Sequence, residues 1–387
     1  MNRLTTSWGA CELARFPEDP RDTLRAWDAA DEYLLRHLHG TDDTPPTGLS
    51  GTVAVVGDRW GALVTSLAAH AAGPVTQISD SFLGQQATRV NLARNDVAAG
   101  AVRLLTARQE PPKRVDVLLV RVPKSLALLE DQLHRLAPAV HADTVVIGTG
   151  MVTEIHTSTL KLFERIIGPT RTSLAAKKAR LIFCTPEPGL PRTGSPWPLR
   201  YALPSDTGVL AGRTVTNHAG IFCAERLDIG TRFFLRHLPR SRGPERVVDL
   251  GCGNGVVGTA VALANPDAAV TFTDESFSAV ASAEATFGDN VPSGTAEFVV
   301  GDGLSALPDE SVDLVLNNPP FHSHRATTDT AARRMFADAR RALRSGGELW
   351  VVGNRHLGYH VRLKRLFGNC EVVASDPKFV VLKAVRR

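Results

Sequence analysis

Short β-branched runs, glycine-containing turns and helices of small residues follow one another along the chain. Residues 51–70 (GTVAVVGDRWGALVTSLAAH) have this order, and so do residues 245–264 (ERVVDLGCGNGVVGTAVALA). A short, continuous apolar run is typical of a strand that is buried on both faces of a parallel sheet. We therefore predict an α/β protein in which mostly parallel sheets carry helices on both faces.

The same order of elements occurs twice, which indicates an internal duplication. Residues 115–124 (VDVLLVRVPK) match residues 312–321 (VDLVLNNPPF). In the strand that follows each glycine turn, we align Asp80 with Asp274. Each copy is then expected to form one Rossmann-like domain.

Two domains are expected, at residues 1–184 and 216–387. Between them, residues 185–215 are dense in Pro, Gly and Ser and predict a linker or an irregular crossover. The first copy lacks polar groups of the second, since Val55 stands where the second copy has Asp249. We expect the chemistry in the second domain and a recognition or scaffold role for the first.

Composition narrows the class of protein. Of the 387 residues, 43% are hydrophobic and 22% are charged, and no apolar run is long enough to span a bilayer. The lack of such a run predicts no membrane association. The five cysteines contain no CxxC pair, so we expect a reducing cytoplasm and no structural metal. The net charge of +4 is uneven, with acids gathered in residues 1–43 and bases in residues 355–387. That basic region favours a polyanionic partner, although a solvated charged face has the same composition.

The glycine-rich turn in residues 247–258 (VVDLGCGNGVVG) is a candidate cofactor site. Glycines let the backbone approach a ligand closely. The turn also satisfies the dinucleotide pattern GxGxxG, so a NAD-linked oxidoreductase stays open as an alternative. Asp249, two residues before Gly251, would repel a pyrophosphate but suits a ligand with a cationic amino-acid end, such as S-adenosylmethionine (SAM).

Acids close three successive predicted strands, at Asp249, Asp274 and Asp302. At the carboxyl edge of a parallel sheet they would face one ligand. We expect Asp274 to accept hydrogen bonds from the ribose hydroxyls and Asp302 to lie beside the adenine. The predicted SAM contacts from these strands and turns are Asp249, Gly251, Cys252, Gly253, Asn254, Gly255, Asp274, Glu275, Gly301, Asp302, Gly303 and Asn318.

The fourth strand ends in Asn318-Pro319-Pro320-Phe321, which we predict to be the catalytic motif. Prolines fix φ and remove backbone donors, so the carbonyls of Asn318 and Pro319 become rigid acceptors. With the Asn318 side-chain oxygen they suit a planar exocyclic amino group, which has two N–H donors. Phe321 would stack on that plane, a contact of about 1–3 kcal/mol. The amine nitrogen would then be aimed at the sulfonium methyl group.

These motifs resemble class I SAM-dependent methyltransferases that carry an NPP-aromatic motif. More narrowly, the whole chain resembles bacterial ribosomal RNA (guanine-N2)-methyltransferases, which have a degenerate N-terminal copy and an active C-terminal copy. Residues 353–385 look most like the members that act on 23S rather than 16S rRNA. The resemblance implies methylation of the N2 amino group of a guanine in 23S rRNA, or in a ribosomal subunit precursor, by a monomer.

The resemblance also implies that the segment before the glycine turn packs over the cofactor, which adds Phe222, Asp228 and Gly230. Asn317 departs from the family pattern, where a small residue or Cys precedes the motif. For RNA contacts we nominate four residues that follow the motif or lie in the basic C-terminal region: His322, Arg325, Arg355 and Lys364.

Other substrates with a planar amino group stay open, namely 16S rRNA guanine, the N6 of DNA adenine and the N5 of a protein glutamine. A non-catalytic RNA-binding assembly factor is a further alternative from a different class. We do not expect His322 and His324 to hold a metal, because no acid or cysteine accompanies them.

Overall fold

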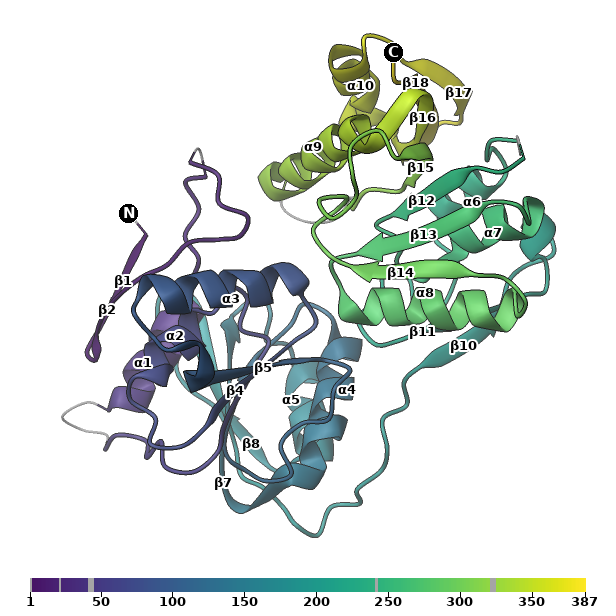
Figure 1. The fold of residues 1–387 in the computed structure, drawn as a ribbon. Helices are drawn as coiled ribbons and strands as arrows, with labels where there is room; N and C mark the ends of the chain where they lie inside the picture. Colours follow the sequence, from purple (N-terminus) through teal and green to yellow (C-terminus); the bar gives the residue numbers. More distant parts are fainter. Residues whose placement is uncertain (1, 21, 41–44, 241–242, 321–324) are drawn as a thin grey trace. The chain divides into compact units, whose positions relative to one another are not determined.

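The computed structural model describes residues 2–20, 22–40, 45–240, 243–320 and 325–387. The chain divides into two units, Met1–Pro196 and Trp197–Arg387 (Figure 1). In the described part of each unit, seven strands form one sheet. Both sheets have the same strand order, with a parallel body and an antiparallel strand next to one edge, which confirms the predicted α/β class with two tandem copies.

The sheet of the first unit has its strands side by side in the order β5 (Val102–Thr106), β4 (Val75–Ser79), β3 (Val53–Val56), β6 (Val115–Arg121), β7 (Val140–Met151), β9 (Ala179–Cys184) and β8 (Thr170–Thr172). One face is covered by α1 (Ala29–His39), α2 (Ala62–Ala68) and α3 (Phe82–Arg94). The other face is covered by α4 (Leu126–Leu136) and α5 (Thr157–Ile166). A small hairpin, β1 (Arg3–Thr6) and β2 (Gly9–Glu12), and two short 3-10 turns, η1 (Ala99–Ala101) and η2 (Ala137–Ala139), complete the unit.

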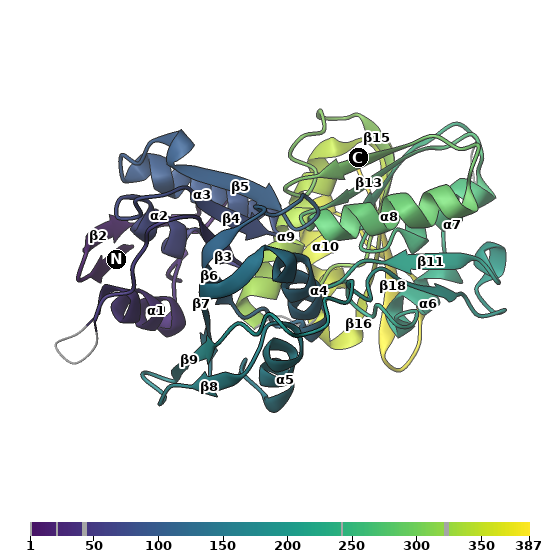
Figure 2. The same ribbon diagram turned by 90° about the horizontal axis from the view of Figure 1, so that it is seen from below.

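The second unit repeats this plan (Figures 1 and 2). Its sheet order is β14 (Ala296–Val300), β13 (Ala269–Asp274), β12 (Arg246–Leu250), β15 (Val312–Asn317), β16 (Leu343–Asn354), β18 (Phe379–Val385) and β17 (Glu371–Ser375). One face carries α6 (Ile229–Leu235), α7 (Val256–Ala264) and α8 (Phe277–Asn290), and the other carries α9 (Arg325–Ala342) and α10 (Tyr359–Phe367). A hairpin of β10 (Leu199–Ala202) and β11 (Thr214–Asn217) precedes the sheet, with η3 (Gly208–Leu210) inside it and η4 (Arg355–Leu357) after β16.

Alternate residues of the central strand β12 serve two different cores. Val248 and Leu250 pack into the cluster that holds α9 and α10, while Val247 packs with α7 and α8. Because successive side chains of a strand point to opposite faces, Asp249 lies on the same face as Val247, under α7. This alternation places a carboxylate beneath the helix that follows the glycine turn.

The strand registers relate the two copies residue by residue. Val53 pairs with Val75 in the first sheet, and Val247 pairs with Val270 in the second. Ser79, four residues after Val75, therefore matches Asp274, and the predicted equivalence of Asp80 with Asp274 is wrong by one residue. The strand after the glycine turn starts one residue later in the second copy, which a comparison at constant spacing cannot detect.

One predicted segment differs from the structure. Residues 185–215 contain β10 and the start of β11, so this segment is not wholly irregular. Its prolines lie outside the paired residues, where missing N–H groups do not interrupt a ladder. Helix α9 ends at Ala342, since Leu343 already pairs with Val312 of β15.

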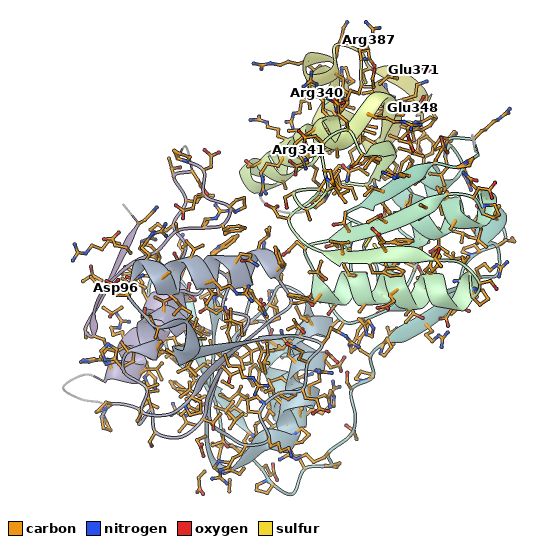
Figure 3. The ribbon with its side chains drawn as sticks, viewed as in Figure 1. Asp96, Arg340, Arg341, Glu348, Glu371 and Arg387 are labelled. Carbon is orange, nitrogen blue, oxygen red and sulfur yellow. The ribbon has the colours of Figure 1, made fainter. Side chains whose placement is uncertain are left out.

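Some arginines of α9 form ion pairs. Arg341, labelled in Figure 3, donates to the Leu307 carbonyl at 2.8 Å and pairs with Asp309. Arg334 pairs with Asp302. Across the described residues, none of the helices combines the length and apolar character that crossing a bilayer requires.

Candidate active site

The carboxyl ends of the parallel strands in the second unit bring the predicted site residues to one edge. β12 pairs with β13 on one side and with β15 on the other, so strand order reverses between β12 and β15. Open α/β sheets bind ligands at such a switch point. β12 ends at Leu250 before Gly251, β13 ends at Asp274, and β15 ends at Asn317 before Asn318.

A tight turn of glycines joins β12 to α7. Gly251, Gly253 and Gly255 have φ of 70°, 53° and 73°. A Cβ at Gly255 would lie 2.7 Å from the Cα of Ala283, so glycine is needed for the turn to approach α8 this closely. A Cβ at Gly253 would meet no atom within 4 Å, so the turn is open at that point. The turn therefore presents backbone that a ligand can approach.

Two other residues of the turn, Cys252 and Asn254, donate hydrogen bonds to residues of β13 and β11. The Cys252 N–H donates to the Thr273 carbonyl at 3.0 Å, and burial raises the pKa of its thiol well above the ordinary value. Such a thiol is a poor nucleophile. The Asn254 amide donates to the Asn217 side-chain oxygen at 3.0 Å, so β11 braces the turn.

The first two acids hold backbone amides around the turn. Asp274 accepts from the N–H of Gly253 at 3.1 Å and from that of Ser276 at 3.0 Å. Asp249 is buried, and its Oδ2 accepts from the Gly258 N–H of α7 at 2.8 Å. Burial raises the pKa of Asp249 to about 7, because the Gly258 N–H opposes the shift only in part.

The third acid, Asp302, has a partner that the sequence did not indicate. Both of its carboxylate oxygens face one guanidinium nitrogen of Arg334 in α9. The flanking glycines shape this turn, since the Gly301 N–H donates to the Asp274 carbonyl at 3.0 Å and Gly303 has a φ of 55°. A contact of Asp302 with adenine stays a prediction, in which the base would share the carboxylate with Arg334.

The Asn318 side chain is oriented by α6. Its Nδ2 donates to the Thr231 hydroxyl at 2.9 Å. Among the described residues its Oδ1 is buried and has no hydrogen-bond partner. The Thr231 N–H in turn donates to Asp228 at 2.9 Å, which makes Asp228 the N-cap of α6. The motif asparagine therefore offers an unpaired acceptor, and a buried unpaired acceptor costs about 1–3 kcal/mol until a donor reaches it.

The same edge of the first unit is filled by charged side chains. Register places Arg121 where the second unit has Asn318, and its guanidinium is buried. Arg121 donates to Asp28 at 2.6 Å and to Glu154 at 2.8 Å. Arg59, at the position of Gly253, pairs with the same two acids at 3.3 and 2.6 Å. Although burial opposes its ionisation, Arg121 and Arg59 hold the pKa of Glu154 at about 2.

Comparisons with known proteins match this two-copy plan. Residues 1–188 match the family described as RLMG N-terminal domain, and residues 212–383 match the methyltransferase small domain. The chain is 72% identical over 384 residues to the ribosomal RNA large subunit methyltransferase G of Streptomyces avermitilis, covering 99% of each chain. It is 48% identical over 383 residues to the protein of that name from Stutzerimonas stutzeri, again with 99% of each chain covered.

The chain belongs to the ribosomal RNA large subunit methyltransferase G family. Among solved structures, it resembles the T. thermophilus 16S rRNA N2 G1207 methyltransferase in complex with AdoMet and guanosine. The TM-score is 0.76 with 19% identity, and the match covers 100% of this chain and 97% of that one. At this identity the likeness concerns the fold, and it supports two methyltransferase-type units in one chain.

The remaining predicted site residues of this family member lie in three different settings. Phe222 is exposed, and the Glu275 N–H faces Asp274. Phe321 and His322 lie outside the described residues, as does the Arg325 side chain. Arg355 and Lys364 are exposed on η4 and α10. Within the described parts of the chain, no group of His, Cys, Asp or Glu side chains is arranged to hold a metal ion.

Sequence reasoning missed Thr231, Arg334 and Asn217, which contact the motif asparagine, Asp302 and the glycine turn. A signal for Thr231 was present, because residues 233–238 (FFLRHL) repeat residues 33–38 (YLLRHL). This repeat extends the duplication to α1 and α6 and aligns Thr231 with Asp31. The partners Arg334 and Asn217 come from distant segments and leave no comparable pattern.

Proposed function

We propose that this protein transfers a methyl group from SAM to the N2 amino group of a guanine in 23S ribosomal RNA. The observation that carries the proposal is the buried Oδ1 of Asn318 at the sheet edge next to the glycine turn, with which no described residue pairs. Family membership supports the reaction class and the ribosomal substrate. As an rRNA-modifying enzyme it would act in the cytoplasm.

The residues at this edge fit SAM. The glycine turn is open at Gly253, and the half-buried Asp274 keeps a lone pair beyond its three backbone contacts for a ribose hydroxyl. Asp249 lies beneath α7, so we assign it to supporting the turn rather than to direct contact with the cationic end. When bound, SAM supplies a methyl group activated by its sulfonium charge.

Asn318 would act by holding the amine and stabilising its charge. Its Oδ1 and the Pro319 carbonyl accept the two N–H bonds of the amino group, which directs the nitrogen lone pair at the methyl carbon. As the new N–C bond forms and the S–C bond breaks, positive charge develops on nitrogen, and these oxygens stabilise it. The extra proton then leaves the nitrogen to solvent water.

The arrangement also predicts a different role for each of the two units. The charged groups that fill the sheet edge of residues 1–184 leave that unit a recognition role, while residues 216–387 carry the chemistry. Arg355 and Lys364 would contact rRNA phosphates from the second unit. A monomer suffices for this scheme, because the proposed catalytic residues all belong to one unit.

The test is methyl transfer from radiolabelled SAM to 23S and 16S rRNA, with the modified nucleotide mapped by primer extension. We expect label at one guanine N2 in 23S rRNA, and we expect Asn318→Ala to lose at least 100-fold in rate while still binding SAM. Label confined to 16S rRNA would overturn the choice of substrate. An unchanged rate in Asn318→Ala would overturn the catalytic assignment.

A further inference from the structure

We propose that Thr231, held by Asp228, is a positioning residue that fixes the Asn318 amide with its oxygen facing the substrate. The inference rests on the proposed function and deepens it, because it explains which end of the asparagine amide the amine meets. It concerns Thr231 on α6 and Asn318 at the end of β15, which are 87 residues apart in the sequence.

The direction of the amide follows from counting protons. A Thr hydroxyl has one proton to donate, and an ionised carboxylate can only accept. Thr231 Oγ1 lies 3.3 Å from the Asp228 carboxylate, so the hydroxyl proton is used in that contact. The hydroxyl then has only lone pairs to offer at 2.9 Å from Asn318, which selects the Nδ2 end.

This hydrogen-bond chain determines the chemistry of the free end. With Nδ2 engaged, Oδ1 is left as the acceptor, and no described residue pairs with it. A flipped amide would instead present an N–H donor to an amino group that also donates. That arrangement would repel the substrate amine and remove one of the acceptors that stabilise its developing charge.

The first unit shows the same three positions with different chemistry. Its α1 is also N-capped by an acid, Asp28, and Asp31 stands where α6 has Thr231. Arg121, in the place of Asn318, lies 3.4 Å from Asp31 and 2.6 Å from Asp28. In both units the helix N-terminus therefore holds the residue at the strand end. Only the second unit has a neutral amide there, which leaves an acceptor available.

The packing of α6 supports a precise placement. A Cβ at Gly230 would lie 3.0 Å from the Asp228 Oδ2 and 3.1 Å from the Phe379 ring. Glycine at this position thus lets the first turn of α6 sit against β18 without displacing the carboxylate that orients Thr231. This close packing is the physical reason for a glycine between the N-cap acid and the threonine.

The test compares three threonine variants by single-turnover methyl transfer at saturating SAM. Thr231→Val keeps the shape of the side chain but removes the hydroxyl, and we expect the rate to fall about 10- to 100-fold. Its Kd for SAM should stay within about twofold of wild type. Thr231→Ser restores the hydroxyl and should recover most of the missing rate. Thr271→Val, on β13 away from this edge, is the matched control and should leave the rate unchanged.

A double variant separates positioning from a general loss of structure. If Thr231 acts through Asn318, then Thr231→Val combined with Asn318→Ala is no slower than Asn318→Ala alone. A full wild-type rate in Thr231→Val, with Asn318→Ala inactive, would overturn this inference and leave the proposed function standing. Wild-type rates in both single variants would instead overturn the catalytic assignment of Asn318, on which this inference rests. Failure of Thr231→Ser to recover the rate would also count against a hydroxyl-based role.

Discussion

The buried carboxyl of Asp249, next to the glycine turn, makes the folding stability of the second unit depend on pH. Burial raises its pKa to about 7, against about 3.9 in an unfolded chain. Between these values the folded state holds a proton that the unfolded state lacks. The stability from this group is therefore full below about pH 4 and is lost as pH rises through about 7.

We predict that Asp249→Asn removes this pH dependence from the second unit. Between about pH 5 and pH 8, wild type should lose about 3 kcal/mol of unfolding free energy relative to the variant. The measurement is hydrogen exchange of β12 amides, corrected for the intrinsic effect of pH on exchange. Asp309→Asn, at an exposed carboxylate of the same unit, is the control and should follow wild type. Parallel curves for wild type and Asp249→Asn would contradict the assignment.

At the scale of single residues, the sequence predicted which strand-end side chains lie at the carboxyl edge of the sheet but not what they contact there. The acids at Asp274 and Asp302 and the amide at Asn318 follow from strand ends that share one sheet edge. Their partners Thr231 and Arg334 come from helices whose rotation about the sheet depends on packing. A pattern of apolar positions predicts the buried face of a helix, but not which polar group at its end meets a strand.

At the scale of elements, apolar periodicity predicted the parallel strands and their helices well, because buried strands leave continuous runs. The hairpin of β10 and β11 was missed, since its strands are only four residues long, β10 is half exposed, and Pro and Gly lie around them. This hairpin is nevertheless part of the candidate site, because Asn217 at its end holds Asn254 in the glycine turn.

A second feature at the scale of elements is the exposed basic face of η4 and α10. α10 buries Tyr359, Leu363 and Phe367, which leaves Lys364 exposed. Arg355 follows the carboxyl end of β16, the edge that also holds Asn318. A basic face beside the site suits RNA phosphates.

We therefore predict that Arg355→Gln combined with Lys364→Gln weakens binding to 23S rRNA without changing the Kd for SAM. The slope of log K against log salt should shrink by about 1 for each phosphate that is no longer neutralised. Filter binding at several salt concentrations measures this slope. Arg344→Gln, at the amino end of β16 and ion-paired with Asp313, is the matched control. An equal weakening in Arg344→Gln would indicate a general effect of charge instead of a specific RNA-binding surface.

At the scale of the whole molecule, the same fold occurs twice, and the two copies differ in the residues at the carboxyl edge of the sheet. In the first unit, Arg59 and Arg121 fill the positions of Gly253 and Asn318 and are neutralised by Asp28 and Glu154. Breaking such a buried network by removing one partner is costly, about 3–5 kcal/mol. A ligand could enter this edge only by displacing the network, so the first unit should not bind SAM.

We predict that each chain has one SAM site. This site should be lost when an arginine replaces Gly253, the position that Arg59 occupies in the first unit. Isothermal titration of the full chain should give a stoichiometry of about one. Gly253→Arg places a side chain where a Cβ meets no atom, and its φ of 53° adds a strain of about 1–2 kcal/mol that the fold should tolerate, while SAM binding falls below detection. Arg59→Ala in the first unit is the control and should keep one site. Two sites in wild type, or one site remaining in Gly253→Arg, would mean that the ion network does not close the edge of the first unit.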